Sequence, residues 1–251
     1  MIDLVPRHQL GYVLPVLVAD CVQYQFYRTF PSDCLLVCNP LDLKSFSPEG
    51  VDEALAPFDP AIDFLIGRKV DRITQGGIPI SALAGRTRIR KLLDDAQART
   101  SIPITADFEE TIEAIQSFGI KRVAVAAKWD DRLMAGVADY LRDAGIETVG
   151  TCAEVHSAAQ VVAINPQDGV DMALALGRKA FADNPSADGL LLAGGAWLSL
   201  QAVPILEAEF GKPVITNPTA TYWAALKQFG RAPIQQGLGQ LLDSLHQGSN
   251  T

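Results

Sequence analysis

Short apolar segments alternate with amphipathic helical patterns along almost the whole chain. The apolar segments are continuous rather than alternating, as expected of strands that are buried on both faces of a parallel sheet. They lie at residues 11–18, 35–38, 70–74, 102–105, 122–127, 147–151, 189–193 and 213–216. Predicted helices lie between them, at residues 82–100, 108–118, 130–144, 167–183, 198–210 and 220–229. This alternation predicts an α/β fold with parallel sheets and right-handed crossovers.

The pattern also repeats itself once along the chain. Pro103 and Pro213 precede equivalent apolar runs 110 residues apart, and Gly119 and Gly230 end equivalent helices 111 residues apart. Near-equal offsets predict two similar parallel-sheet halves, Rossmann-like or flavodoxin-like, related by a pseudo-two-fold with a cleft between them. We assign residues 1–103 with 218–251 to the first α/β domain and residues 104–217 to the second.

Composition excludes several classes of partner. The 251 residues are 48% hydrophobic and 20% charged, with a net charge of −8, so neither nucleic acid nor an acidic membrane surface is an expected partner. The four cysteines do not form a disulfide scaffold, and no convincing signal peptide precedes the first apolar run, which favours the cytoplasm. The three histidines lack metal-ligand spacing, and no Walker A or strict GxGxxG run occurs. We therefore expect neither a metal nor an organic cofactor.

Glycine-containing turns follow one predicted strand in each half. Gln75-Gly76-Gly77 ends a strand of the first half, and Gly194-Gly195 ends the corresponding strand of the second. Because ligands bind beyond the carboxyl ends of parallel strands, these turns are expected to face each other across one cleft. Glycine at these positions allows the backbone conformations that a tight strand-to-helix turn requires. The N–H groups of these glycines are also candidates for holding a carboxylate or enolate oxygen.

Six segments carry motifs in a recognisable order: GYVLP at 11–15, LKSFSPEGVD at 43–52, GIPISALAG at 77–85, FGIKRVAVAAKW at 118–129, DGLLLAGGAWLSLQAVP at 188–204 and LEAEFGKPVITNPTATYW at 206–223. In this order they resemble the aspartate/glutamate racemase superfamily, most closely its arylmalonate decarboxylase and maleate cis-trans isomerase branch. The resemblance implies two similar α/β halves. It also implies chemistry in which two cysteines, one in each half, exchange protons with the carbon beside a carboxylate; the decarboxylase branch keeps only the second cysteine.

This sequence departs from the family pattern where the chemistry resides. The first cysteine position falls at Gly77 and the second at Gly194, while a Thr-Ser pair of the decarboxylases falls at Ile78-Pro79. A thiol both donates and accepts a proton once its pKa is tuned, and glycine does neither. We therefore expect no thiol-based racemisation, isomerisation or decarboxylation. We also expect Gly194→Cys to leave folding intact.

Lys128, Trp129 and Asp130 follow a predicted strand of the second half, at the edge of the cleft. One interpretation is a solvated lysine with Asp130 capping the next helix. The other is that Lys128 attracts an anion, or acts as a base or Schiff-base amine after desolvation lowers its pKa, with Trp129 as an apolar wall. Lys128 and Asp130 are our catalytic candidates.

Hydroxyl and amide groups end the last predicted strand. Thr216, Asn217 and Thr219 are typical helix caps, but the family resemblance implies that this turn binds the substrate carboxylate. Gln75 and Ser81 are expected to contribute from the opposite half.

These observations favour a cofactor-independent enzyme that acts on a small carboxylate or carbonyl compound by lyase- or isomerase-type chemistry through an enolate-like intermediate. The alternative is a non-catalytic relative that binds a small acid or supports a partner enzyme. A lysine aimed into the cleft favours catalysis, whereas a cleft filled by Ile78, Trp129 and Trp197 favours a dead site. Assembly into a homo-oligomer is left open.

Overall fold

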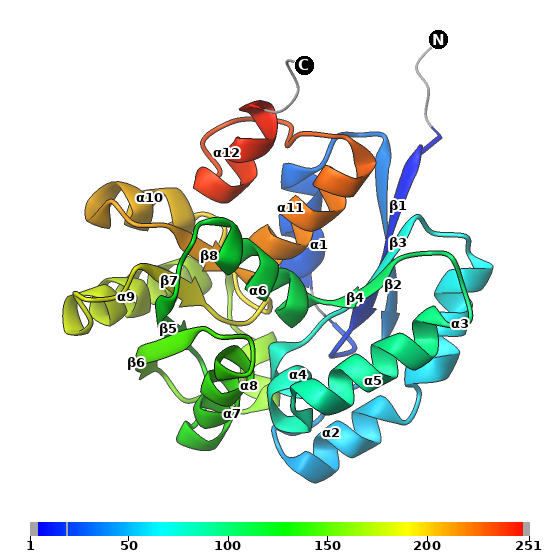
Figure 1. Ribbon diagram of the computed structural model, residues 1–251, viewed down its shortest axis with the longest axis horizontal. Helices are drawn as coiled ribbons and strands as arrows, with labels where there is room; N and C mark the ends of the chain where they lie inside the picture. Colours follow the sequence, from blue (N-terminus) through cyan, green and yellow to red (C-terminus); the bar gives the residue numbers. More distant parts are fainter. Residues whose placement is uncertain (1–4, 19, 248–251) are drawn as a thin grey trace.

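The computed structural model describes residues 5–18 and 20–247, which form two parallel four-stranded sheets (Figure 1). The strand orders are β2-β1-β3-β4 and β6-β5-β7-β8. The strands are β1 His8–Leu14, β2 Cys34–Pro40, β3 Arg72–Gln75, β4 Ile104–Ala106, β5 Arg122–Ala127, β6 Glu147–Ala153, β7 Gly189–Leu192 and β8 Val214–Thr216. The identical order in both sheets confirms the predicted pair of similar α/β halves.

Helices connect the strands and cover the sheets. They are α1 Asp20–Thr29, α2 Pro48–Leu55, α3 Phe58–Gly67, α4 Ile78–Ala84, α5 Arg86–Gln97, α6 Asp107–Ser117, α7 Asp131–Arg142, α8 Ala158–Val162, α9 Pro166–Asp183, α10 Ala202–Phe210, α11 Asn217–Phe229 and α12 Gln240–Gln247. Several begin at side-chain caps, because Ser47, Asp130 and Asn165 each accept a hydrogen bond from a backbone N–H of the first turn. Such caps fix where the chain turns away from the end of a strand or loop.

Backbone hydrogen bonds show which positions of the two halves correspond. The Gly76 N–H donates to the Val13 carbonyl in the first half, and the Ala193 N–H donates to the Ala126 carbonyl in the second. Two residues after Val13 and Ala126 lie Pro15 and Lys128, so these two residues occupy equivalent places beyond the first strand of each half.

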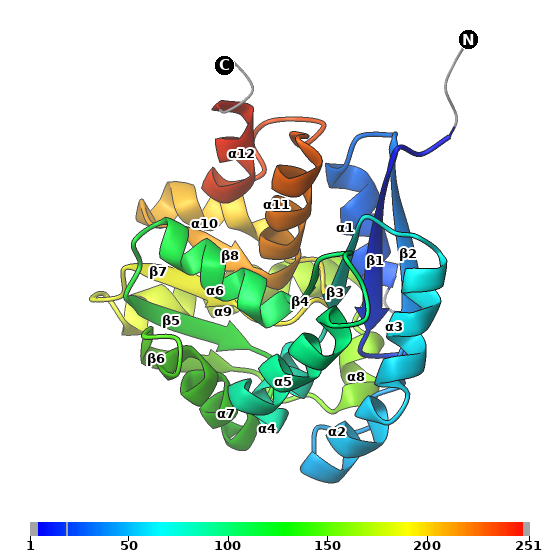
Figure 2. The ribbon, with the colours of Figure 1, turned by 45° about the vertical axis from the view of Figure 1, so that its right-hand side comes forward.

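The two halves meet through packed helices (Figure 2). Helices α6 and α11 lie against each other, and α4 of the first half packs on α7 of the second. The buried Glu110 of α6 accepts hydrogen bonds from Arg72 at 2.7 Å, Thr74 at 3.0 Å and Thr221 of α11 at 2.7 Å. This fully partnered carboxylate holds β3, α6 and α11 together below the cleft.

Two predicted elements differ from the structure for local reasons. The first strand ends at Leu14 instead of residue 18, because Pro15 has no N–H for a sheet ladder and Val18 is 64% exposed. The helix predicted at residues 82–100 is two helices, α4 and α5, which meet at Gly85. That glycine has φ +80°, a value outside the helical range.

Other differences concern elements that sequence patterns did not indicate. Helices α1, α2, α3, α8 and α12 were not predicted. Strand β4 pairs with β3 in the first sheet, whereas the expected domain boundary after residue 103 assigned it to the second half. The domain division itself stays a prediction. Among the described residues, no helix has both the length and the apolar character needed to cross a membrane.

Candidate active site

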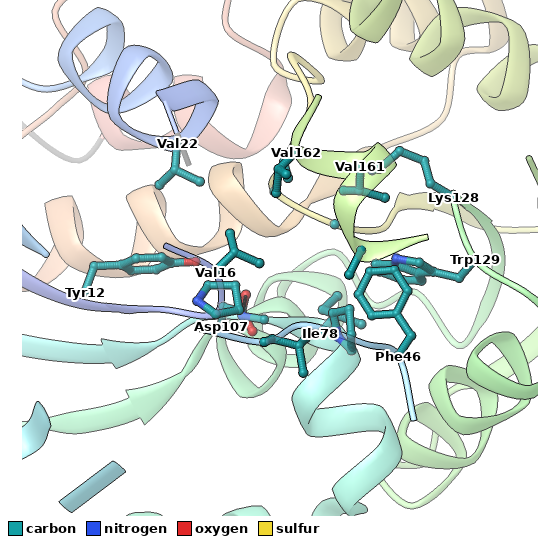
Figure 3. A pocket seen from close by; sticks show the side chains of 18 residues that line it. Tyr12, Val16, Val22, Phe46, Ile78, Asp107, Lys128, Trp129, Val161 and Val162 are labelled. Atoms are coloured by element: carbon teal, nitrogen blue, oxygen red, sulfur yellow. Dashed lines mark hydrogen bonds between the residues drawn. The ribbon is translucent and has the colours of Figure 1, made fainter. Parts of the chain in front are cut away.

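A pocket of about 50 Å³ lies between the two halves, beyond the carboxyl ends of β1 and β5. Its walls are largely apolar and include Val22, Phe46, Ile78, Trp129 and Val161. The polar side chains that line it are Tyr12, Asp107 and Lys128. Figure 3 shows Tyr12 and Asp107 on one side, and Lys128 and Trp129 on the other. The pocket therefore brings a carboxyl group from one half and an amine from the other to a single apolar space.

The glycine turns face this pocket as predicted, since both Gly77 and Gly194 line it. Their N–H groups, however, are already occupied: the Gly77 N–H donates to Asp107 Oδ2 at 2.8 Å, and the Gly194 N–H donates to Asn217 Oδ1 at 2.8 Å. The prediction that these two N–H groups hold a carboxylate or enolate oxygen is not met in this structure. The acceptors are distant in sequence, because each begins the helix that follows the last strand of its sheet, α6 after β4 and α11 after β8.

Asp107 begins α6 and is the carboxyl group that faces the pocket. Its Oδ2 accepts the Gly77 N–H and, at 3.1 Å, the amide N–H of Asn217. Its Oδ1 has no hydrogen-bond partner within the described part of the chain, and the residue is 2% exposed. Burial raises the pKa of Asp107 to about 7, against the opposing effect of the two hydrogen bonds. A carboxyl group with this pKa gives or takes a proton near neutrality.

Lys128 follows β5 and is fully buried, with 0% exposure. This corrects the interpretation of a solvated lysine at a strand end. Its Nζ lies 3.4 Å from the ring centroid of Trp197 and has no hydrogen-bond partner among residues 5–18 and 20–247. Burial lowers the pKa of Lys128 well below its ordinary value, and the nearby Cys21 opposes this only in part. The amine is therefore held in an environment that favours its neutral, nucleophilic form.

Lys128 fills the space beside the glycine of its own half. A Cβ built on Gly194 would lie 3.0 Å from Lys128 Nζ and 3.0 Å from the Trp129 ring. Gly194 also has φ +101°, which side chains of L-amino acids rarely adopt. The structure therefore predicts strain in Gly194→Cys, and the expectation that this variant still folds stays a prediction. The amine stands where a side chain at position 194 would extend.

Tyr12 lies next to Asp107 in the first half. Its hydroxyl points into the space beside that carboxyl group in Figure 3, and its ring fills the space beside Gly76. Burial raises the pKa of Tyr12 well above its usual value, and the charge of Asp107 adds to the effect. Tyr12 is therefore a neutral hydrogen-bond donor at working pH.

The pocket gathers only part of the predicted site. Gly77, Lys128, Trp129, Gly194 and Gly195 line it. The others lie behind or away from it: Gln75, Gly76, Ser81, Asp130, Thr216, Asn217 and Thr219. Their roles in binding or catalysis remain predictions.

Each of the residues outside the pocket has a structural partner. Asp130 is exposed and caps α7 by accepting the Leu133 N–H at 3.0 Å, so it does not face Lys128. Thr216 and Thr219 form a buried capping box at the start of α11. The Gln75 amide donates to the Gly76 carbonyl and accepts the Ser81 hydroxyl hydrogen bond at 3.4 Å. These hydrogen bonds within the chain use groups that we expected to bind substrate.

Asp107 and Tyr12 were missed, although the sequence carried a signal for one of them. Asp107 and Asn217 are 110 residues apart, the same offset as Pro103 and Pro213, so the repeat that located the Asn217 turn also marks Asp107. Nothing in the local sequence marks Tyr12.

All four cysteines belong to the described residues and carry free thiols, and none of them lines the pocket. No group of three or more His, Cys, Asp or Glu side chains suited to a metal gathers in residues 5–18 and 20–247.

Comparison with known proteins places the chain in a family. The family model described as arylmalonate decarboxylase matches residues 27–242. The chain belongs to the arylmalonate decarboxylase family. Arylmalonate decarboxylase of Bordetella bronchiseptica is 25% identical over 236 residues, which cover 93% of this chain and 96% of that protein. Maleate isomerase of Pseudomonas putida is 31% identical over 146 residues, 57% of this chain and 56% of that protein.

Solved structures of the arylmalonate decarboxylase family and of maleate isomerases share the fold. A liganded arylmalonate decarboxylase variant superimposes with a TM-score of 0.85 at 24% identity, over 94% of this chain and 99% of that one. Maleate cis-trans isomerase of Nocardia farcinica, in a variant with a covalently bound succinylcysteine intermediate, gives a TM-score of 0.82 at 18% identity, over 94% and 98%. These matches confirm the expected family branch and the two-half α/β architecture.

Proposed function

We propose that this protein is a lyase or isomerase that acts on a small carboxylate or carbonyl compound without a thiol, with the Lys128 amine as its reactive group. The observation that carries the proposal is the position of Lys128 Nζ, which is buried, unpartnered among the described residues and 3.0 Å from the Cβ position of residue 194. In the family, a cysteine at this position contacts the substrate carbon.

The two titratable groups of the pocket supply the proton transfers. Lys128 is neutral at a pH where an exposed lysine is charged, so it takes a proton from carbon or attacks an electrophile. Asp107 approaches from the other half with a pKa of about 7 and supplies or removes the second proton. Together they support an enolate-like intermediate in an apolar space, where charge interactions are stronger than in water.

The relatives support the same class of reaction. They carry the names arylmalonate decarboxylase and maleate isomerase, and one isomerase variant holds a succinyl group bonded to cysteine. We carry over from them a small-molecule carboxylate or carbonyl substrate and a reactive group at the second-half turn. A cytoplasmic location, which the four free thiols support, and a homo-oligomer remain parts of the proposal.

A non-catalytic role is less well supported. A buried amine without a hydrogen-bond partner costs stability, and an abandoned site gains by replacing it with an apolar side chain. Ile78 and Trp129 do line the pocket, but Lys128 lines it too and leaves a cavity. A site that keeps this costly arrangement in the same pocket as Asp107 is better explained by chemistry.

The test is a turnover assay on phenylmalonate, maleate and short 3-oxo acids, read by NMR in D₂O as product formation and deuterium incorporation. We expect turnover of at least one compound, and Lys128→Met to reduce it by about 10³-fold, within the range for loss of an acid–base group. Lys121→Met, at an exposed lysine, is the matched control and should leave turnover unchanged. Equal activity of the Lys128→Met variant would contradict the proposal.

A further inference from the structure

We infer that Lys128 acts as a covalent nucleophile, forming an imine with a ketone or aldehyde carbonyl of the substrate. This inference rests on the proposed function and narrows it: the substrate class becomes a small oxo acid or oxo compound instead of a simple dicarboxylate. The juxtaposition that carries it is an unpartnered, fully buried Nζ that lines the pocket opposite the free Oδ1 of Asp107.

The pocket offers few hydrogen-bond donors that could stabilise a negative charge. An enolate formed from a carboxylate needs hydrogen-bond donors aimed at its oxygens. The N–H groups of Gly77 and Gly194 are occupied by Asp107 and Asn217, and Pro79 has no N–H to offer, so the Tyr12 hydroxyl is the neutral donor left from the groups considered above. A protonated imine does not need such hydrogen-bond donors. The electron pair released at the adjacent carbon moves to the imine nitrogen, and a neutral enamine forms.

Aromatic rings lie close to Lys128 Nζ. Within the described part of the chain Lys128 Nζ has no hydrogen-bond partner, and it lies over the Trp197 ring at 3.4 Å from the centroid. Desolvation by apolar and aromatic neighbours is one of the ways by which proteins keep a lysine nucleophilic. The same aromatic face attracts the cation that forms once the imine is protonated.

The steps balance with water as the sole co-reactant. Lys128 Nζ bonds to the carbonyl carbon, the carbonyl oxygen leaves as water after proton transfers, and a protonated imine remains. Carbon dioxide or a proton then leaves the adjacent carbon, and its electron pair moves to the imine nitrogen. Asp107 delivers a proton to the enamine carbon through its free Oδ1, and water hydrolyses the imine to release product and the amine.

The size of the pocket sets the size of the substrate. The cavity volume is about 50 Å³, so the pocket suits a compact substrate. Phe46, Ile78 and Val161 restrict the remaining space to apolar groups. Acetoacetate, with four carbons and a ketone two bonds from its carboxylate, is therefore the probe of choice.

The experiment incubates the full chain with acetoacetate and sodium cyanoborohydride at pH 7, followed by peptide mapping. We expect Lys128 to be labelled at least tenfold more than the exposed Lys91 and Lys121, because fewer than roughly one in a thousand exposed lysines are neutral at this pH. Since mapping is done on the unmodified sequence, the result does not depend on whether a Lys128 variant folds.

A second readout is exchange of the ketone oxygen with H₂¹⁸O, which an imine requires and simple proton transfer does not. Label on Lys128 together with ¹⁸O incorporation supports the inference. Labelling spread evenly over exposed lysines, without ¹⁸O incorporation, overturns it. If turnover of phenylmalonate or maleate persists in that case, the proposed function stands while the imine fails; if no turnover occurs either, both fail.

Discussion

The two halves of this protein share their strand order but differ in the side chains that could react at corresponding positions. Pro15 of the first half matches Lys128 of the second, and Asp107 matches Asn217. In both halves a glycine with positive φ donates its N–H to the first residue of the helix that follows the last strand of the sheet, α6 after β4 and α11 after β8. The backbone geometry is therefore duplicated, whereas the reactive groups are not.

This asymmetry divides the chemistry between the halves. The second half supplies the amine and a neutral amide, and the first supplies the carboxyl group and the Tyr12 hydroxyl. The hydrogen bond from the Asn217 amide to Asp107 Oδ2 joins the two sides and orients the carboxyl group, so that Oδ1 is left for the pocket. A pair of cysteines, one in each half, would give both halves the same reactive group, so the halves would not need different roles.

Among variants that compare the two halves, the largest expected effect comes from removing the ionisable carboxyl group of Asp107. Asp107→Asn keeps the shape of the side chain and its contacts with Gly77 and Asn217, but it cannot transfer a proton. We expect turnover to fall by about 10²-fold, as for loss of a general acid or base. Steady-state kinetics against Glu113→Gln, at an exposed carboxylate, measures the effect. Unchanged turnover would remove Asp107 from the mechanism.

The same variant carries a pH signature. The pKa of Asp107 is about 7 in the folded chain and 3.8 in the ordinary case, so the folded state binds more protons between these values. The contribution of Asp107 to stability is therefore present below about pH 4 and is lost as the pH rises through 7. Urea unfolding from pH 4 to 8 should show a smaller decline for Asp107→Asn than for the natural sequence.

Making the second half resemble the first should destabilise the protein. Asn217→Asp removes the amide N–H that reaches Asp107 and places a second carboxyl group against it. We expect a loss of about 2–3 kcal/mol at pH 8 with partial recovery at pH 5, where the pair shares a proton. Denaturant unfolding at the two pH values tests this. Asn39→Asp, on strand β2, should show no such recovery.

The glycine turns should differ in their tolerance of a side chain. At Gly77 a Cβ would lie 2.7 Å from the Pro15 ring, and at Gly194 it would lie 3.0 Å from the movable end of Lys128. Since both glycines have positive φ, we expect losses of about 2 kcal/mol for Gly77→Ala and about 1 kcal/mol for Gly194→Ala. Gly67→Ala is the control in these unfolding measurements, because a Cβ added at Gly67 would meet no atom within 4 Å. A reversed order would contradict this comparison.

The smallest effect is a gain in stability from losing the amine. Lys128→Met removes a buried polar group without a hydrogen-bond partner in the described chain, so we expect the free energy of unfolding to rise by about 1 kcal/mol at pH 7. The gain should shrink toward pH 10, because the unfolded chain no longer gains a proton there. Thermal unfolding of Lys128→Met, with Lys121→Met as the control, measures this change in stability. A lower stability of the Lys128→Met variant would mean that the amine stabilises the fold.

The sequence allowed prediction of what depends on regular spacing. Continuous apolar runs and the 110-residue offset revealed two parallel-sheet halves and placed Gly77 and Gly194 at one pocket. Burial of Lys128 was not predictable in this way, because a lysine at a strand end is ordinarily solvated and the Trp197 ring that lies over its amine comes from far along the chain. Occupation of the glycine N–H groups depends on partners 30 and 23 residues away, which local patterns do not reveal.

The most direct test of the central claim is the titration of Lys128 itself, followed by NMR of its ¹³Cε and ¹⁵Nζ in selectively labelled protein, with Lys128→Met assigning the signal. Our interpretation predicts an amine that is neutral at pH 7 and whose pKa lies well below that of the exposed lysines. A Lys128 signal that titrates together with those of Lys91 and Lys121 would show an ordinary charged lysine, and the thiol-free mechanism would lose its reactive group.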